Sequence, residues 1–552
     1  MNTIALRPPD VVMRLDRMGA SHPTRLSFLR AMMRQAEREA WKVAPSAWEI
    51  DDDGFGHAVI RVDMPMRTYS LVAFSTPLAD AMRTDRVIAE AWDTSYVLYD
   101  GMPDAAEIAR LAANVPLQEA GRFSERDLIL SRANKSVRLF AHVVERLAEG
   151  RQPDAAQIEN VGYLMRTTAV YGNGKFGIAD RDRIAQRPEF AGPFRAEMLT
   201  VWLIRSFTIA LAEHMARRRA PGRAAMLDPE LRRQPGVGNS TGLGMAPFLV
   251  RHPFLLHRWM LARETALARV RSLAAADRGS IDGFLAALAA MQDNIRRWKT
   301  EDAAQGAALL RLAADCDKIS SKAGSILAGE AQPWEALYRF AEQNLSLEGQ
   351  EAMVALMLEP HGALVDELAD TMACDEAAVY RIDGAMSCGA LRGLIETHYG
   401  WALAYDFGSA EADARFWYVS EEKLEPRLGE RHSEPGAERE QPLAVARDIR
   451  RLAAVLEAEP SESPVANLLL GQPQWRHVVR RVQLAAGNPY TEIRGNLIGA
   501  TMRPIDLLRS KLAFFGASRF DPRSDRWLRI SLFAGAPFPE DIAAQKTARA
   551  TS

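Results

Sequence analysis

Three glycine-rich segments hold the residue types that bind anions and move protons. They span residues 171–177, 236–244 and 487–496. Glycine lets backbone N–H groups approach a ligand closely, and the asparagine and hydroxyl side chains beside it add donors and acceptors. We expect the three segments to act as loops that meet over one polar pocket. The structural alternative is that they are ordered connectors between helices, with glycine in turns and asparagine at caps.

The second segment is suited to holding an anion. Successive backbone amides over Gly238, Asn239, Ser240, Thr241 and Gly242 would form a nest for a carboxylate or a phosphate. Lys175 would supply a matching point charge and Arg494 a bidentate fork. The predicted substrate-binding residues are Asn173, Gly238, Asn239, Ser240, Thr241, Asn488, Tyr490, Arg494 and Asn496.

Proton transfer needs a titratable group beside the bound anion. The predicted catalytic residues are Lys175, Tyr171, His252 and Glu492. Lys175 would stabilise developing negative charge, while one of the other three would give or take a proton. A tyrosine in such a segment is also a common packing anchor, and a lone histidine is often structural. The outline fits a lyase, an isomerase, a hydrolase or a group transferase equally well.

Two established types of site are not supported by the spacing. Residues 172–177 formally match the dinucleotide fingerprint G-x-G-x-x-G, which requires a strand before it and a helix after it. The pattern before residue 172 predicts a helix, and the residues after 177 are polar. His142 and Glu145 form a single His-x-x-Glu, and no His-Glu-x-x-His occurs, so we predict no metal site.

Composition narrows the partners. The chain has 552 residues and a formal net charge of −2, which argues against a nucleic-acid binder. The three cysteines lie far apart, which fits a reducing cytoplasm. The most apolar helical pattern, residues 198–212, is too short to span a bilayer and contains Arg205. We therefore expect a cytoplasmic protein whose partner is a small molecule, with no nucleic acid and no membrane; a homo-oligomer stays open.

Lysine usage adds weight to one candidate. Only nine of the 69 basic residues are lysine, so a lysine that is retained is more often required. Lys175 falls within the first glycine-rich segment.

The periodicity predicts a mainly α, multi-helix protein with a small α+β element near the N-terminus. Residues 58–64 and 68–74 predict a hairpin, with one more strand within 87–99, and residues 401–407 and 414–420 predict two short strands. From residue 124 to about 400 the pattern predicts helices. We divide the chain into an α+β region at 1–120, a helical core domain at 121–400 and a C-terminal region at 401–552 with a polar loop at 421–441.

Two other classes of function fit the sequence. One is a helical scaffold whose segments only connect helices, which predicts a large exposed apolar patch. The other is a helical cofactor-binding protein with a haem, a flavin or a nucleotide; the sequence does not identify a cofactor.

Overall fold

The computed structural model describes residues 4–18, 24–79, 82, 91–116, 124–172, 184, 186–241, 252–373, 381–405, 417–420, 426–428, 440–442, 445–494, 504–524 and 527–542. The chain forms two compact units. Unit 1 comprises Met1–Leu26, Gly242–Phe514 and Pro522–Leu528, and unit 2 comprises Ser27–Thr241, Phe515–Asp521 and Arg529–Ser552.

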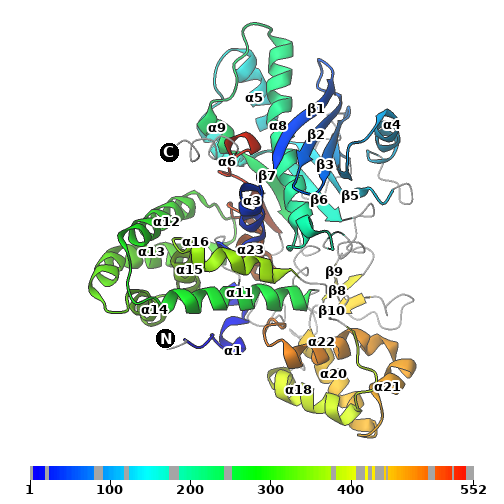
Figure 1. Ribbon diagram of the computed structural model, residues 1–552, viewed down its shortest axis with the longest axis vertical. Coiled ribbons are helices and arrows are strands. Elements are labelled where there is room, and N and C mark those ends of the chain that lie inside the picture. Colours follow the sequence, from blue (N-terminus) through cyan, green and yellow to red (C-terminus); the bar gives the residue numbers. More distant parts are fainter. Residues whose placement is uncertain are drawn as a thin grey trace. The chain divides into compact units, whose positions relative to one another are not determined.

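Unit 2 is built on a large mixed sheet. Nine strands follow the order β1-β2-β3-β4-β5-β6-β7-β12-β11 (Figure 1). Neighbours from β1 to β6 are antiparallel, and β6 and β7 are parallel. The strands are β1 (Lys42–Ile50), β2 (Gly56–Asp63), β3 (Thr68–Ser75), β4 (Thr94–Asp100), β5 (Asp127–Lys135), β6 (Tyr163–Gly172), β7 (Gly236–Thr241), β11 (Asp521–Ser524) and β12 (Trp527–Leu532).

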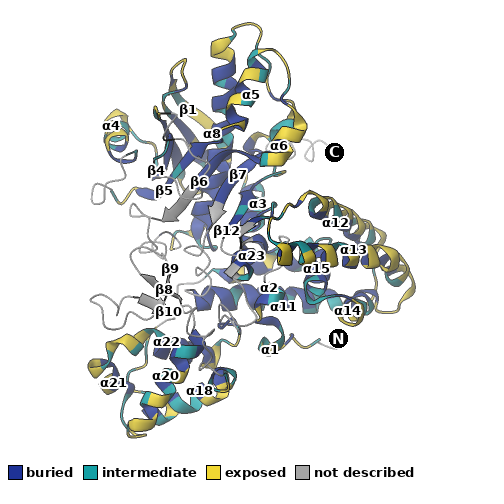
Figure 2. Ribbon diagram, turned by 180° about the vertical axis from the view of Figure 1, so that it is seen from behind, coloured by how far each residue is buried: buried dark blue, intermediate teal, exposed yellow. Residues whose placement is uncertain are grey.

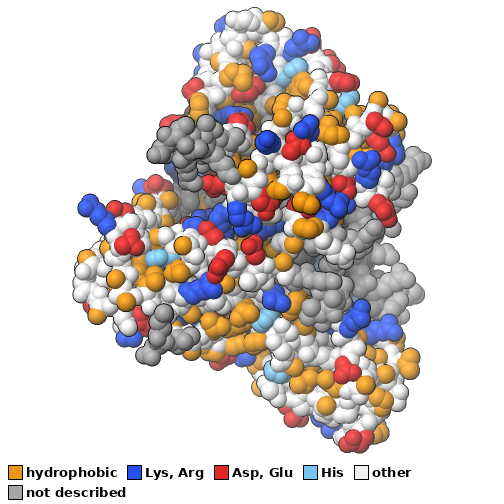
Figure 3. All heavy atoms as spheres, viewed as in Figure 1, with side chains coloured by type: hydrophobic (Ala, Val, Ile, Leu, Met, Phe, Trp, Pro, Cys, Tyr) orange, Lys and Arg blue, Asp and Glu red, His pale blue; other side chains and the backbone are white. Residues whose placement is uncertain are grey.

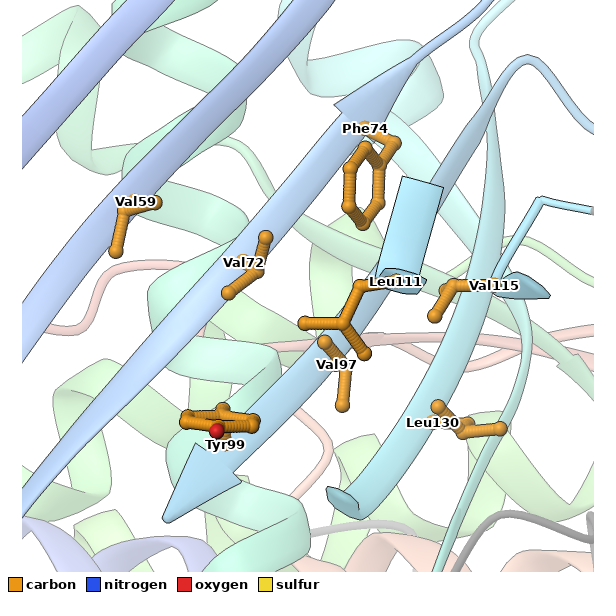
Figure 4. Packing of buried hydrophobic residues seen from close by; sticks show 8 residues of the cluster. All are labelled: Val59, Val72, Phe74, Val97, Tyr99, Leu111, Val115 and Leu130. Carbon is orange, nitrogen blue, oxygen red and sulfur yellow. The ribbon is translucent and has the colours of Figure 1, made fainter. Parts of the chain in front are cut away.

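Helices cover both faces of this sheet. The long helix α8 contacts β3, β4, β5, β6 and β7 and also packs on α3 and α5. On the other face, Leu111 of α4 points among Val72, Val97 and neighbouring strand side chains (Figure 4). The helices of this unit are α3 (Phe28–Arg38), α4 (Ala105–Asn114), α5 (Leu139–Ala148), α6 (Ala155–Val161), η2 (Pro188–Phe190), α8 (Arg195–Arg219) and α9 (Pro229–Arg233).

The sheet makes the predicted mainly α fold wrong. The hairpin of β2 and β3 and the strand β4 were expected, but residues 127–135 and 163–170 were predicted as helix and residues 171–172 as loop. Strand β5 is buried at almost every position, so it lacks the alternation that marks a strand with one face in water. The helix that begins after Asp154 stops at Val161 because Gly162 takes a left-handed conformation, with φ of 79°.

Unit 1 is mainly helical. Its helices are α1 (Pro9–Val12), α2 (Leu15–Met18), α11 (Pro253–Arg271), α12 (Arg278–Arg297), α13 (Ala303–Gly329), α14 (Pro333–Asn344), α15 (Leu347–Leu358), α16 (Gly362–Val365), η4 (Asp366–Met372), α18 (Cys388–Leu403), α20 (Val445–Ala458), α21 (Val465–Gly471), η6 (Pro473–Trp475), α22 (Arg476–Gly487) and α23 (Pro504–Phe515). In Figure 2, α12 and α13 each show an exposed side and a buried side.

A second, small sheet has the order β10-β8-β9. Its strands are β8 (Trp417–Ser420), β9 (Pro426–Leu428) and β10 (Glu440–Pro442). The strand predicted for 414–420 is therefore present as β8. The strand predicted for 401–407 is wrong at its start, because residues 401–403 complete α18. Within the described ranges, no helix combines the length and the apolar character that crossing a bilayer requires.

Candidate functional site

The first two glycine-rich segments begin on adjacent strands of the large sheet. Strand β6, the helix α8 and strand β7 form a βαβ unit, and β6 pairs with β7 in parallel from Tyr163↔Gly236 to Thr167↔Asn239. Both strands therefore run toward the same edge of the sheet. In open sheets that contain βαβ units, ligands bind beyond the carboxyl ends of parallel strands.

These two segments are not simple loops, as the sequence predicted. Residues 171–172 end β6, and residues 236–241 form β7. A strand therefore comes directly before the G-x-G-x-x-G match at residues 172–177, where we predicted a helix. The helix that a dinucleotide fingerprint requires directly after Gly177 would fall on residues 173–183, which lie outside the described residues, and the described helix α8 begins at Arg195.

Two glycines of β7 are explained by packing. A Cβ on Gly236 would lie 2.3 Å from the carbonyl oxygen of Leu532, and a Cβ on Gly238 would lie 2.5 Å from the ring of Tyr163. Neither neighbour can move away easily, because one is backbone and the other a buried ring. The glycine at these two positions therefore lets β7 fit against its neighbours, which is a different role from the ligand approach that we predicted.

Asn239 is a polar residue that is buried in the sheet. Its side chain is 6% exposed, and its Nδ2 donates to Oγ1 of Thr167 at 3.3 Å. Its Oδ1 is buried and has no hydrogen-bond partner among the described residues. A buried acceptor without a donor costs about 1–3 kcal/mol. Asn239 is thus the predicted binding residue for which the structure gives a specific unmet hydrogen bond.

Asn239 belongs to a row of residues that crosses five strands. The register pairs Ser75 with Thr94, Thr94 with Ala133, Ala133 with Thr167, and Thr167 with Asn239. All five residues are buried. Residues that pair across a sheet share one face. The row therefore places a chain of hydroxyl and amide groups inside the unit, where each must find a partner.

Other predicted residues of these two segments are only partly described. Asn173 and Lys175 lie outside the described residues, as does Gly242. The backbone of Tyr171 belongs to β6, and the backbones of Ser240 and Thr241 belong to β7. Tyr171 pairs with Leu130 of β5.

The third segment belongs to unit 1, and its polar groups serve that unit. Asn488 caps α22 and its Nδ2 donates to the carbonyl oxygen of Leu484 at 2.9 Å. The hydroxyl of Tyr490 donates to the carbonyl oxygen of Arg7 at 2.8 Å. These contacts match the alternative in which the segment is an ordered connector between helices.

The charged residues of this segment are also held within unit 1. Arg481 donates to the buried carboxylate of Glu492, with Nε at 3.0 Å from Oε2. Burial raises the pKa of Glu492, against the opposing effect of Arg481. The backbone N–H of Arg494 donates to the carbonyl oxygen of Met13 at 2.6 Å. Asn496 lies outside the described residues.

His252, also in unit 1, is buried at the N-cap of α11.

His257 lies on α11 and contacts this segment, and its protonation makes the stability of the folded state depend on pH. Its Nδ1 accepts from the backbone N–H of Tyr490 at 3.2 Å. Burial, with a smaller effect of Arg258, lowers its pKa from 6.5 to about 4. The folded state therefore keeps His257 neutral, so its contribution is complete above pH 6.5 and is lost as the pH falls toward 4. The full loss amounts to about 3 kcal/mol.

We predict that His257→Asn reduces the acid sensitivity of unit 1. Asparagine keeps an acceptor for the Tyr490 N–H but has no proton to gain. Denaturant midpoints at neutral pH and near about pH 5 should therefore fall further apart in the wild type than in the variant. The same loss in both proteins would contradict a titration of His257.

Sequence reasoning missed a second polar cluster in unit 2. Nζ of Lys135, the last residue of β5, lies 3.1 Å from Oγ of Ser75, the last residue of β3. The backbone N–H of Lys135 donates to Oδ1 of Asp93 at 3.1 Å. The scarcity of lysine was a signal for Lys135 as much as for Lys175. Within the described part of the chain, no group of three histidine, cysteine, aspartate or glutamate side chains is arranged for a metal ion.

Comparisons with known proteins add no relative. No family model, no curated protein and no solved structure matches this chain.

Proposed function

We propose that this chain is an enzyme that acts on a small anionic or polar organic substrate. The binding site would lie beyond the carboxyl ends of β6 and β7. The observation that carries the proposal is Asn239, two residues before the end of β7, whose buried Oδ1 lacks a donor among the described residues. A hydroxyl or amide group of a substrate would supply that donor and remove the cost of the unmet hydrogen bond.

The residues that follow the two strands supply the complementary chemistry. Lys175 comes three positions after the end of β6 and would carry the positive charge for a carboxylate or a phosphate. The backbone amides beyond Asn239 would stabilise negative charge that develops during the reaction. Of the predicted proton carriers, Tyr171 is the one on β6, so it is the residue that we assign to proton transfer. Glu492 is engaged by Arg481 in unit 1, so we no longer assign it this role.

One further observation favours a phosphate group as the bound anion. The Gly172–Gly177 match follows a strand that has a parallel neighbour, as in phosphate-binding βαβ units. The polar residues that follow Gly177 in the sequence argue against a full dinucleotide site, so we propose a single phosphate or carboxylate group. The reaction type stays open among lyase, isomerase, hydrolase and group transferase.

The rival function, a helical scaffold, has less support. Large hydrophobic side chains that are strongly exposed include Met66, Met226, Leu310 and Leu470, which lie on different elements. Over α12, α13 and α14, Figure 3 shows hydrophobic, acidic and basic side chains interspersed. Single exposed hydrophobic residues are ordinary on a protein surface and need no partner.

We predict that Lys175→Ala abolishes turnover while the melting temperature stays nearly unchanged. The lysine would act on the substrate, and a residue with that role contributes little to the folded state. The measurement is product formation from small carboxylic acids and phosphate esters, followed by mass spectrometry. Lys322→Ala, at an exposed position of α13, is the matched control and should keep full turnover. A variant that unfolds, or one that turns over normally, would return the segment to a structural role.

A further inference from the structure

The cluster around Lys135 has the parts of a nucleophile with its base. Ser75 ends β3, Asp93 comes directly before β4, and Lys135 ends β5, so three adjacent strands bring these residues together. Ser75 is 2% exposed, Asp93 0% and Lys135 8%. Lysine is among the residue types least often buried, so a buried lysine at the end of a strand is unusual.

Backbone contacts hold the cluster in one arrangement. Asp93 accepts from the backbone N–H of Lys135 and donates its own N–H to Oδ1 of Asn134 at 2.9 Å. Nδ2 of Asn134 in turn donates to the carbonyl oxygen of Ala91 at 3.0 Å. The N–H of Thr76 donates to the carbonyl oxygen of Asp93 at 2.9 Å. The ends of β3 and β5 are thus both tied to the residue before β4, which fixes Ser75 relative to Lys135.

Two aromatic rings lie near the amino group of Lys135. Its Nζ lies 5.6 Å from the ring centroid of Phe55 and 5.8 Å from that of Phe140. The Ser75 hydroxyl at 3.1 Å can accept a hydrogen bond from an ammonium group or donate one to a neutral amine. The second arrangement is the one that activates a serine, because an adjacent amine removes the hydroxyl proton as the oxygen attacks.

We propose that Ser75 and Lys135 form a nucleophile–base pair for acyl transfer from esters with a short apolar acyl group. The amine of Lys135 takes the Ser75 hydroxyl proton as Oγ bonds to the acyl carbon. The ester C–O bond then breaks, and the leaving alcohol takes the proton from Lys135. Water repeats the sequence on the acyl-serine, which releases the carboxylic acid and restores Ser75. The two phenylalanine rings near Nζ would favour a small apolar acyl group.

This pair is independent of the anion site proposed at β6 and β7, so either proposal can fail alone. The test uses the full chain and p-nitrophenyl acetate as the probe. Acetylated peptides are located by tandem mass spectrometry, and the release of p-nitrophenolate is followed in parallel. We expect an acetyl group on Ser75 and an initial burst of p-nitrophenolate. Ser75→Ala should lower the release by about 100-fold.

Two further variants separate catalysis from folding. Lys135→Arg keeps a donor toward Ser75 but stays charged and cannot act as a base, so it should fold and leave Ser75 unacetylated. Ser70→Ala removes another buried hydroxyl of β3, which donates to the carbonyl oxygen of Gly101, and should keep full acetylation of Ser75. Acetylation of Lys135 in place of Ser75, absence of acetyl on Ser75, or equal acetylation in Lys135→Arg would each overturn the proposal.

Discussion

Replacing Arg7 by methionine is expected to destabilise unit 1 by about 4 kcal/mol. Arg7 donates from Nε to Oε2 of Glu264 at 2.8 Å and from Nη1 to Oε1 of Glu351 at 2.9 Å. The side chains of all three residues are at most 6% exposed. Burial alone would raise the pKa of Glu264, but the charge and hydrogen bonds of Arg7 outweigh it and lower the pKa. Methionine would leave these carboxylates short of a partner in a dry environment.

Chemical denaturation followed by fluorescence measures this effect. Removal of both partners of a buried ion pair costs less than removal of one, because no unpaired charge is left behind. The double variant with Arg7→Met and Glu264→Leu should therefore be more stable than Arg7→Met alone. Arg14→Met is the matched control, since Arg14 pairs with Asp16 at the surface and should change stability by less than about 0.5 kcal/mol. Equal stability of Arg7→Met and wild type would contradict the network.

Arg205→Met is expected to destabilise unit 2 by about 3 kcal/mol and to release its C-terminal segment. The guanidinium of this α8 residue donates to the carbonyl oxygens of Arg233, Pro235 and Ala536, at distances of 2.7, 2.8 and 2.7 Å. It also lies 4.0 Å above the ring of Phe538. Burial lowers its pKa to about 9. Methionine fills similar space but leaves three carbonyl groups without their donor.

Thermal melting and limited proteolysis read out the two parts of this prediction. We expect a lower melting temperature and faster cleavage between residues 533 and 542 in Arg205→Met. Arg205→Lys should fall between the wild type and methionine, because one ammonium group cannot serve three separated carbonyls. Unchanged cleavage with a lower melting temperature would mean that Arg205 stabilises α8 without holding the C-terminal segment.

The elements that could be predicted are those whose residues show a regular pattern of apolar side chains. Residues 58–64 and 68–74 have the apolar, β-branched composition of strands and pair as β2 and β3. Strand β5 carries no such signal because almost all of its residues, on both faces, are buried. In β6, the helix signal from Asp154 concealed the stop at Gly162. A glycine-rich strand such as β7 has the composition of a turn, so local reasoning cannot identify it.

The site was predictable only in part for a similar reason. The sequence directed attention to Asn239, and parallel pairing places this residue beside Thr167 of β6. Ser75 and Lys135 are 60 residues apart, and Arg7 and Glu264 are 257 apart. Contacts between residues so far apart in the sequence depend on strand order and helix packing, which a single sequence does not specify. The polar residues at 488–494 have local composition like that of a binding site but serve as ties within unit 1.

Ligand-dependent thermal stability of the wild type and of Asn239→Leu tests the central claim most directly. A ligand that binds only the folded state raises the melting temperature. With small hydroxy acids and hydroxylated phosphate esters as probes, we expect at least one to stabilise the wild type and none to stabilise the folded variant, which lacks the Oδ1 that would accept from the probe's hydroxyl group. Equal stabilisation of both proteins, or no stabilisation of the wild type by any probe, would contradict an anion site at the carboxyl ends of β6 and β7.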